Sequence, residues 1–237
     1  GRSSPLGHMT TTVDHSSHAL LIRERRLVKA RKIEAVLRHY RVPIAGASVL
    51  DVGTGGGFIA ENFVASGATV SACDRDNQLP PDSRINFRLA EGLAIPFPDK
   101  SFDIVVSNHV IEHVGPDAHE EHLRECARVC RRVVYLATPN RWTIGLEPHF
   151  KRPFLSWPPQ RLRPRWYDVW PLSRGEIVRH ANAAGLEPTD ATGIAMRLMS
   201  AELPGPARTF VERAPLWLGG VPVIPSLVFL LRPCAMP

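Results

Sequence analysis

A turn with four glycines and one carboxylate is the part of this sequence whose residue types are best suited to hold a small molecule. It runs Asp51-Val52-Gly53-Thr54-Gly55-Gly56-Gly57. The apolar run before it, residues 47–50, predicts a buried strand, and residues 58–65 predict the helix that follows. Because glycine has no Cβ, such a turn tolerates positive φ and lets a ligand touch the main chain. The segment therefore predicts a ligand-binding turn between a strand and a helix.

A second carboxylate follows at the distance expected of a ribose ligand. Asp74 lies 21 residues after Gly53 and ends the apolar run 68–73, which predicts a second strand. A carboxylate about 20 residues past a glycine turn can accept hydrogen bonds from ribose hydroxyls. The alternative interpretation is an aspartate that opens a surface turn in the polar cluster 74–77.

Three nucleotide-binding patterns compete for the glycine turn. A phosphate-binding P-loop needs Lys and then Ser or Thr after its last glycine, where this chain has Phe58 and Ile59. The dinucleotide fingerprint G-x-G-x-x-G needs glycine at position 58. The remaining pattern is the D-x-G-x-G-x-G of class I S-adenosylmethionine (SAM)-dependent methyltransferases, which this chain resembles.

Two further segments resemble the same family. Residues 88–103 are similar to its D-A-x-x-L-P-F-x-x-x-S-F-D segment, in which an acidic residue holds the adenine amino group, and Glu91 takes that position here. Residues 107–114 are similar to the family's S-N-x-x-x-E-H-V stretch, which follows the fourth strand. The resemblance covers residues 47–114 and is to small-molecule, biosynthetic members of the methyltransferase 11 or ubiquinone-biosynthesis-like type.

The resemblance implies SAM as cofactor and S-adenosylhomocysteine (SAH) as product. The sulfonium is already a strong electrophile, so such an enzyme mainly holds donor and acceptor in line and dry. A general base is needed only where the acceptor must lose a proton. The residues expected to bind the cofactor are Asp51, Gly53, Thr54, Gly55, Gly57, Asp74, Arg75, Glu91, Gly92, Leu93, Ser107 and Asn108.

Three histidines are candidates for that base, namely His109, His113 and His149. The run 109–113 also satisfies H-x-x-E-H, a zinc-peptidase pattern that places two histidines four apart on a helix. Because this run follows a strand of a nucleotide-binding pattern, we predict no metal site. The alternative to a catalytic role is that one of His109 and His113 packs under the cofactor and the other faces solvent.

The alternation of strands and helices predicts a doubly wound α/β sheet of seven strands, mostly parallel, with one antiparallel member. A basic helix is expected within 19–40, and Asp117 with Glu120 predicts the start of a helix that ends at Cys130. A capping box at Ser173 and Glu176 begins a later helix. We divide the chain into a remnant of the expression vector (1–8), an N-terminal helical segment (9–45), a SAM-binding core (46–138), a lid (139–172) and the rest of the sheet domain (173–237).

The predicted lid, 139–172, differs from the rest of the chain in composition. It holds seven prolines and four of the five tryptophans, so it cannot be one regular helix. It follows the fifth strand, where these enzymes insert an acceptor-binding segment. The alternative is a hydrophobic cover in which arginine stems pack on indoles. The residues expected to bind the acceptor are Arg141, Trp142, His149, Arg152, Trp166 and Tyr167.

The leading interpretation is methyl transfer from SAM to a small-molecule acceptor by in-line displacement. Two alternatives stay open: an RNA methyltransferase, suggested by the net charge of +6 and the basic first helix, and a SAM-binding protein without turnover. The absence of an N-P-P-Y-type motif after the fourth strand disfavours nucleic acid. An anionic or a lipidic acceptor remains open. Prolines break the apolar stretch 217–231, so no transmembrane segment is expected. The cysteine pattern favours a location in the cytoplasm. The oligomeric state is not predicted.

Overall fold

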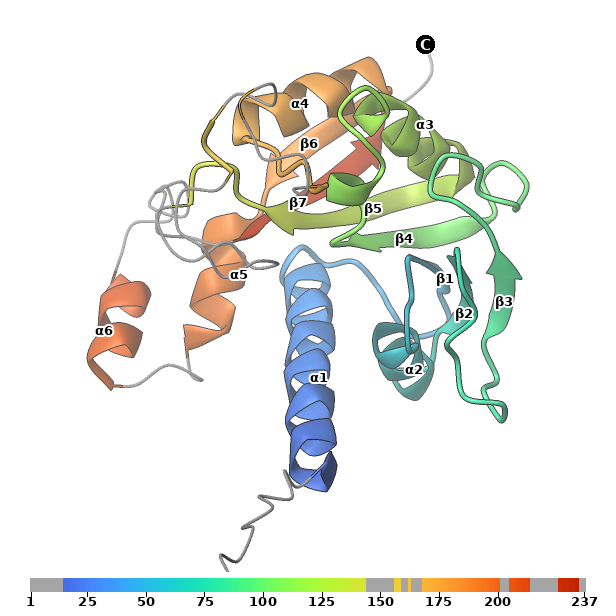
Figure 1. Cartoon of the computed structure of the whole chain (residues 1–237), viewed down its shortest axis with the longest axis horizontal. Coiled ribbons are helices and arrows are strands. Elements are labelled where there is room, and N and C mark those ends of the chain that lie inside the picture. Colours follow the sequence, from blue (N-terminus) through green and yellow to red (C-terminus); the bar gives the residue numbers. More distant parts are fainter. Residues whose placement is uncertain are drawn as a thin grey trace, which may run out of the picture.

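The computed structural model describes residues 15–143, 156–158, 162, 168–200, 205–213 and 226–234. Within these residues, seven strands form one sheet in the order β3-β2-β1-β4-β5-β7-β6 (Figure 1). Only β7 is antiparallel to its neighbours, so the predicted doubly wound sheet is confirmed. The strands are β1 (Ser48–Val52), β2 (Thr69–Asp74), β3 (Asn86–Leu89), β4 (Phe102–Asn108), β5 (Cys130–Pro139), β6 (Leu186–Asp190) and β7 (Ser226–Pro233).

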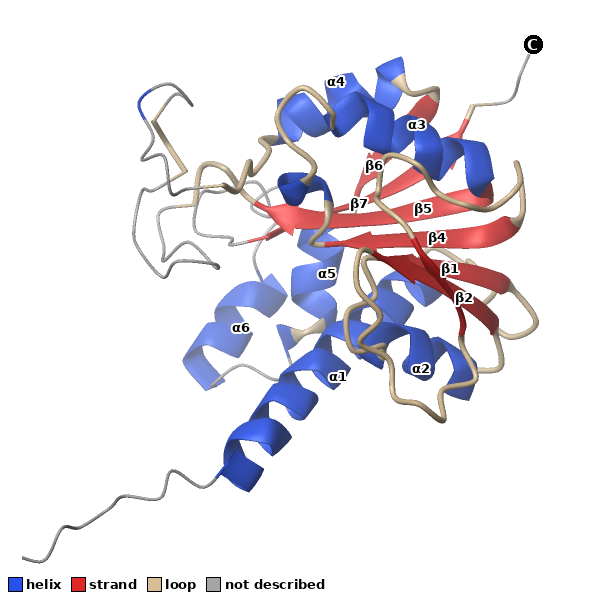
Figure 2. Ribbon diagram, turned by 45° about the vertical axis from the view of Figure 1, so that its right-hand side comes forward, coloured by secondary structure: helices blue, strands red, loops and turns tan. Residues whose placement is uncertain are grey.

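Helices cover both faces of this sheet (Figures 1 and 2). α1, α2 and α5 pack on one face, α3 and α4 pack on the other, and α6 lies against α5. None of the helices in the described ranges combines the length and the apolar character that crossing a bilayer would require. The helices are α1 (His15–His39), α2 (Phe58–Ala65), the 3₁₀ turn η1 (Ile111–His113), α3 (His119–Val129), α4 (Arg174–Ala183), α5 (Thr192–Leu198) and α6 (Gly205–Arg213).

The central strands are apolar on both faces because helices cover both. On β4, Ile104 and Val106 belong to the core under α1 and α2, whereas Val105 belongs to the core under α3 and α4. Successive side chains of a strand point to opposite faces, so a strand covered on both sides must be apolar at nearly every position. This is why β1 and β4 appear in the sequence as short continuous apolar runs.

The glycine turn joins β1 to α2 as predicted. Gly53 has φ 70°, and a Cβ on it would lie 2.5 Å from Cγ2 of Val110, in the loop after β4. No side chain fits that approach, so glycine is required both by the backbone angle and by the contact. The turn thereby brings the end of β1 against the loop that follows β4.

Two local expectations were wrong. His109–His113 is not one helix: His109 has φ 61°, in the left-handed region, and only η1 follows. The His109 N–H still donates to the Ala137 carbonyl on β5 (2.8 Å), so the strand pairing continues to the position where the helix was expected to begin. The N-cap of α3 is Ala118, without a side-chain cap, rather than Asp117.

Two other expectations were confirmed. The capping box of α4 is present, since Ser173 Oγ accepts from Glu176 N (3.3 Å) and the Glu176 carboxylate accepts from Ser173 N (2.8 Å). The helix expected to end at Cys130 also does so, since α3 ends at Val129 with Cys130 as its C-cap, and β5 begins at that residue. Of the predicted lid, the structure describes only 139–143, 156–158, 162 and 168–172.

Candidate active site

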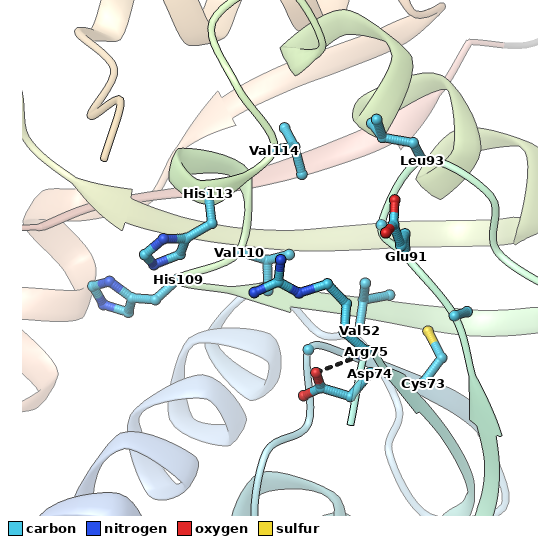
Figure 3. A pocket seen from close by; sticks show the side chains of 13 residues that line it. Val52, Cys73, Asp74, Arg75, Glu91, Leu93, His109, Val110, His113 and Val114 are labelled. Atoms are coloured by element: carbon cyan, nitrogen blue, oxygen red, sulfur yellow. Dashed lines mark hydrogen bonds between the residues drawn. The ribbon is translucent and has the colours of Figure 1, made fainter. Parts of the chain in front are cut away.

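A cavity of about 350 Å³ lies at the carboxyl ends of the parallel strands. It is lined by Gly53 after β1, Asp74 at the end of β2, Glu91 after β3 and His109 after β4 (Figure 3). β1 and β4 are neighbours in the sheet, but the chain continues from β1 towards one edge and from β4 towards the other. Ligands of open α/β sheets bind at such a switch point. We call this the first cavity.

A second cavity, of about 210 Å³, adjoins the first, because Gly53 and His109 line both. The glycine turn contributes Thr54 and Gly55 to it, and Lys29 of α1 lies on its wall. The two cavities together leave room at the switch point for more than one ligand group.

Asp74 connects the end of β2 to the glycine turn. One carboxylate oxygen, Oδ2, accepts a hydrogen bond from Gly55 N (2.8 Å), and Oδ1 accepts one from Arg75 N (2.7 Å), drawn in Figure 3. These bonds to the main chain fix the orientation of the carboxylate on the cavity wall. The bond from Gly55 N also holds the glycine turn in place.

Asp51 lies beneath the turn rather than on the cavity surface. It is 1% exposed, and its Oδ2 accepts a hydrogen bond from Thr54 Oγ1 (2.8 Å). Burial raises the pKa of Asp51 to about 7, and the negative charge of Asp74 adds to that rise, whereas the Thr54 bond opposes it. Asp51 therefore supports the turn from below.

His122 of α3 supports the opposite wall, and the sequence analysis missed it. Its ring is fully buried, with Nδ1 2.9 Å from the Gly92 carbonyl and Nε2 2.9 Å from Ser107 Oγ. A carbonyl only accepts, so Nδ1 donates and Ser107 Oγ donates to Nε2. Burial lowers the pKa of His122, which is consistent with a neutral ring. The available signal was a histidine on the buried stripe of an amphipathic helix, beside Leu123 and Cys126.

His109 and Glu112 form a further pair at the cavity. Nδ1 of His109 lies 3.1 Å from Oε1 of Glu112, which is fully buried. Oε2 of the same carboxylate accepts from Thr138 Oγ1 at the end of β5 (3.1 Å). Figure 3 shows His109 and His113 on the same side of the cavity, although they do not share a helix. In the described part of the chain, no group of three His, Cys, Asp or Glu side chains is arranged to hold a metal ion.

Most of the residues predicted to bind the cofactor line the two cavities. Asp51, Gly57 and Ser107 line neither, since Gly57 packs against Leu79 and Ser107 bonds to His122. The second cavity is lined by Gly53, Thr54, Gly55, Asn108 and His109. The first is lined by Gly53, Asp74, Arg75, Glu91, Gly92, Leu93, His109 and His113.

The residues predicted to bind the acceptor are placed differently. Arg141 pairs with Glu176 (2.7 Å), and its guanidinium lies 5.2 Å from the centre of the Trp142 ring. Trp142 lines a third cavity, of about 220 Å³, together with Asn140 and Arg174. Neither Arg141 nor Trp142 lines the first two cavities. The other predicted positions, His149, Arg152, Trp166 and Tyr167, lie outside the described residues.

The sequence analysis also missed the apolar walls of the site. Burial raises the pKa of the Cys73 thiol to about 12, so this residue is an inert part of the wall. Such positions are recognised only once the strands are assembled, because nothing in their residue type distinguishes them from core. They are Val52, Cys73, Ala90, Val110 and Val114 in the first cavity, and Phe58 and Ile59 in the second.

Known proteins share both the sequence pattern and the fold. Residues 50–138 match the family model described as a methyltransferase domain, Methyltransf_11. The ubiquinone biosynthesis O-methyltransferase of Thiobacillus denitrificans is 32% identical over 176 residues, which cover 65% of this chain and 70% of that protein. The protein of the same name from Rhizobium leguminosarum bv. trifolii is 28% identical over 165 residues, 64% of each chain, so this match spans less than two thirds of that relative's length.

A solved structure agrees over almost the whole chain. Burkholderia thailandensis 1,6-didemethyltoxoflavin-N1-methyltransferase superposes with a TM-score of 0.55 at 17% identity, over 99% of this chain and 94% of that one. At this identity the similarity concerns the fold alone. Together with the site at the switch point, these findings identify the chain as a member of the class I SAM-dependent methyltransferases, whose cofactor is SAM. Within that class it is similar to the ubiquinone biosynthesis O-methyltransferases.

Proposed function

We propose that the protein transfers the methyl group of SAM to a hydroxyl oxygen of a small-molecule acceptor. The observation that carries this proposal is that one cavity unites a fixed carboxylate, Asp74, with the carboxylate-paired histidine, His109. The first suits a ribose, and the second suits an acceptor that must lose a proton. The names of the similar proteins, which are O-methyltransferases, support oxygen as the acceptor atom.

The chemistry of the first cavity fits the cofactor. Asp74 and Glu91 offer carboxylate oxygens to hydroxyl and amino groups, and Arg75 lines the same wall. In the adjoining second cavity, a Cβ on Gly55 would meet nothing within 4 Å, so the main chain there borders open space that a ligand can fill. When bound, SAM supplies an electrophilic methyl group. The chain's own residues hold that ligand, exclude water with Val110 and Val114, and present a base to the acceptor.

The cofactor-binding residues in this proposal are those predicted from the sequence that line the two cavities. The other three predicted residues act indirectly: Asp51 and Gly57 support the glycine turn, and Ser107 bonds to His122. His109 and His113 are the candidate bases on the cavity wall. His149 remains a third candidate, and the acceptor-binding role of the segment 139–172 remains a prediction.

The test measures cofactor binding and product chemistry separately. Calorimetry should show SAH binding in the micromolar range and no binding of NADH. Incubation with SAM carrying a ¹³C-labelled methyl group and a panel of catechols, anilines and thiols should then give O-methyl products by NMR. Binding of NADH without SAH would refute the family's cofactor for this chain, and N-methyl or S-methyl products alone would refute the hydroxyl acceptor.

A further inference from the structure

The backbone at His109 is unusual for a residue with a side chain. Its φ of 61° lies in the left-handed region that favours glycine, and it occupies the first position after β4. Such strain persists only where the surroundings hold it, and it occurs most often at functional sites. The His109 N–H bonds to Ala137 on β5 and its ring bonds to Glu112, so both main chain and side chain are held.

Glu112 is a fully buried carboxylate. Burying an ionised carboxylate is unfavourable unless hydrogen bonds and a positive partner compensate. Its two oxygens face different partners, His109 Nδ1 through Oε1 and Thr138 Oγ1 through Oε2. The Glu112 carbonyl also accepts from Trp170 N (2.8 Å), which fixes the backbone on which this side chain stands. The carboxylate is thus held in one orientation, aimed at the ring of His109.

We propose that Glu112 is a positioning residue that makes His109 the general base of the reaction, an inference that rests on the proposed function. An ionised carboxylate can only accept, so the proton of a neutral His109 ring sits on Nδ1. The lone pair is then on Nε2, on a ring that lines both cavities. Glu112 also stabilises the ring after it has taken up a proton, as the orienting carboxylate of a catalytic triad does.

The proton balance assigns the acceptor class. The acceptor O–H proton moves to Nε2, while the oxygen uses a lone pair to form the new O–C bond. The S–C bond of the sulfonium breaks, and its electron pair stays on sulfur, which leaves SAH as a neutral thioether. The base is useful only to an acceptor that is still protonated when it binds, such as an alcohol or a weakly acidic phenol. An acceptor that is already ionised would not need it.

A first experiment tests the His109–Glu112 assignment without any acceptor. In ¹⁵N-histidine-labelled protein, long-range ¹H–¹⁵N NMR distinguishes the Nδ1–H tautomer from the Nε2–H tautomer. The resonance that disappears in His109→Gly identifies the residue, and glycine suits the positive φ. We expect the Nδ1–H form in the wild type and its loss in Glu112→Gln, whose amide no longer demands a donor. An Nε2–H ring in the wild type, or no change in Glu112→Gln, would overturn the assignment.

A second experiment tests the chemical role with two model acceptors, 4-methylcatechol and the more acidic 4-nitrocatechol. Glu112→Gln and His109→Gly should each lower kcat for 4-methylcatechol about 10²-fold, since a general base contributes about 10²–10⁴-fold. The loss for 4-nitrocatechol should be much smaller, and added imidazole should restore turnover in His109→Gly. The KM for SAM should stay unchanged. Equal losses for both catechols with a raised KM for SAM would show a merely structural role.

The control is another buried carboxylate far from the site. Glu34 is 8% exposed and accepts from Asn62 Nδ2 and Ser66 Oγ between α1 and α2. Glu34→Gln should lower stability while leaving turnover and the His109 tautomer as in the wild type. If the wild type has the Nδ1–H tautomer but methylates neither catechol, the proposed hydroxyl acceptor fails while the pairing of His109 with Glu112 stands.

Discussion

The two sides of the site formed by the first and second cavities are built by different means. On the glycine-turn side, which comprises Gly53, Gly55, Asp74 and Glu91, the main chain does most of the work, as in the bond from Gly55 N to Asp74. On the histidine side, which comprises His109, Glu112 and Thr138, side chains that follow β4 bond to each other and to the end of β5. In the proposed function, the cofactor is therefore held by a main-chain turn that few sequences can form, whereas the chemistry towards the acceptor depends on a few side-chain contacts.

The largest expected effect is on the glycine-turn side. Gly55 has φ 52°, and a valine there would project into the open space beside the turn. We expect Gly55→Val to weaken SAH binding more than about 100-fold, through strain and steric block, while the chain still folds. Calorimetry with SAH measures the loss, and circular dichroism checks the fold.

A matched glycine makes this result specific. Gly46 also has a positive φ, 74°, with nothing within 4 Å of an added Cβ, but it lies before β1 and away from both cavities. Gly46→Val should cost similar stability through the same backbone strain and leave SAH binding intact. Equal binding losses in both variants would mean that the turn acts through stability alone.

The next effect concerns Asp74. Asp74→Ala removes an acceptor from the cavity wall and the bond to Gly55 N, so SAH binding should weaken by about 1–3 kcal/mol. The neighbouring Asp76 is exposed and lines neither cavity, so Asp76→Ala is the control with the same change in charge. Calorimetry of both variants separates a hydrogen-bonding role from general electrostatics. A similar loss in Asp76→Ala would show that the weaker SAH binding comes from the change in charge and not from a lost hydrogen bond.

The same contrast explains how much could be predicted from sequence. The sheet, the glycine turn and the position of Asp74 beside that turn follow from local patterns, because a few adjacent residues determine the geometry of a strand or a glycine turn. The supporting role of His122 depends on contacts with Gly92 and Ser107, which belong to other elements, so its position on the buried stripe of α3 indicates burial but not this role. The left-handed backbone conformation of His109 was missed because the pairing of β4 with β5 overrides the helical pattern of 109–113.

A smaller effect is expected from His119, on the same helix as His122. Burial lowers the pKa of His119 to about 4, and His180 adds to this, whereas Glu176 opposes it. Between about pH 6.5 and about pH 4 the unfolded chain therefore binds more protons at this position than the folded chain, so its contribution to stability falls as the pH falls. In His119→Leu this dependence should vanish. Urea unfolding of both proteins at pH 7 and pH 4.5 should show a difference between them that changes by about 2 kcal/mol. A constant difference would contradict the neutral buried ring.

The smallest effect lies in the sheet, on the strand that contributes Thr138 to the histidine side. Tyr135 of β5 is fully buried, and its hydroxyl has no hydrogen-bond partner among the described residues. Burying a polar group without a partner is unfavourable, so Tyr135→Phe should raise stability by up to about 1 kcal/mol. SAH binding and turnover should not change, since Tyr135 lines neither cavity. Urea unfolding gives the stability, and calorimetry gives the binding. A clear loss of stability would show that the hydroxyl has a partner, and a loss of turnover at unchanged SAH affinity would show that the histidine side extends into the sheet beyond Thr138.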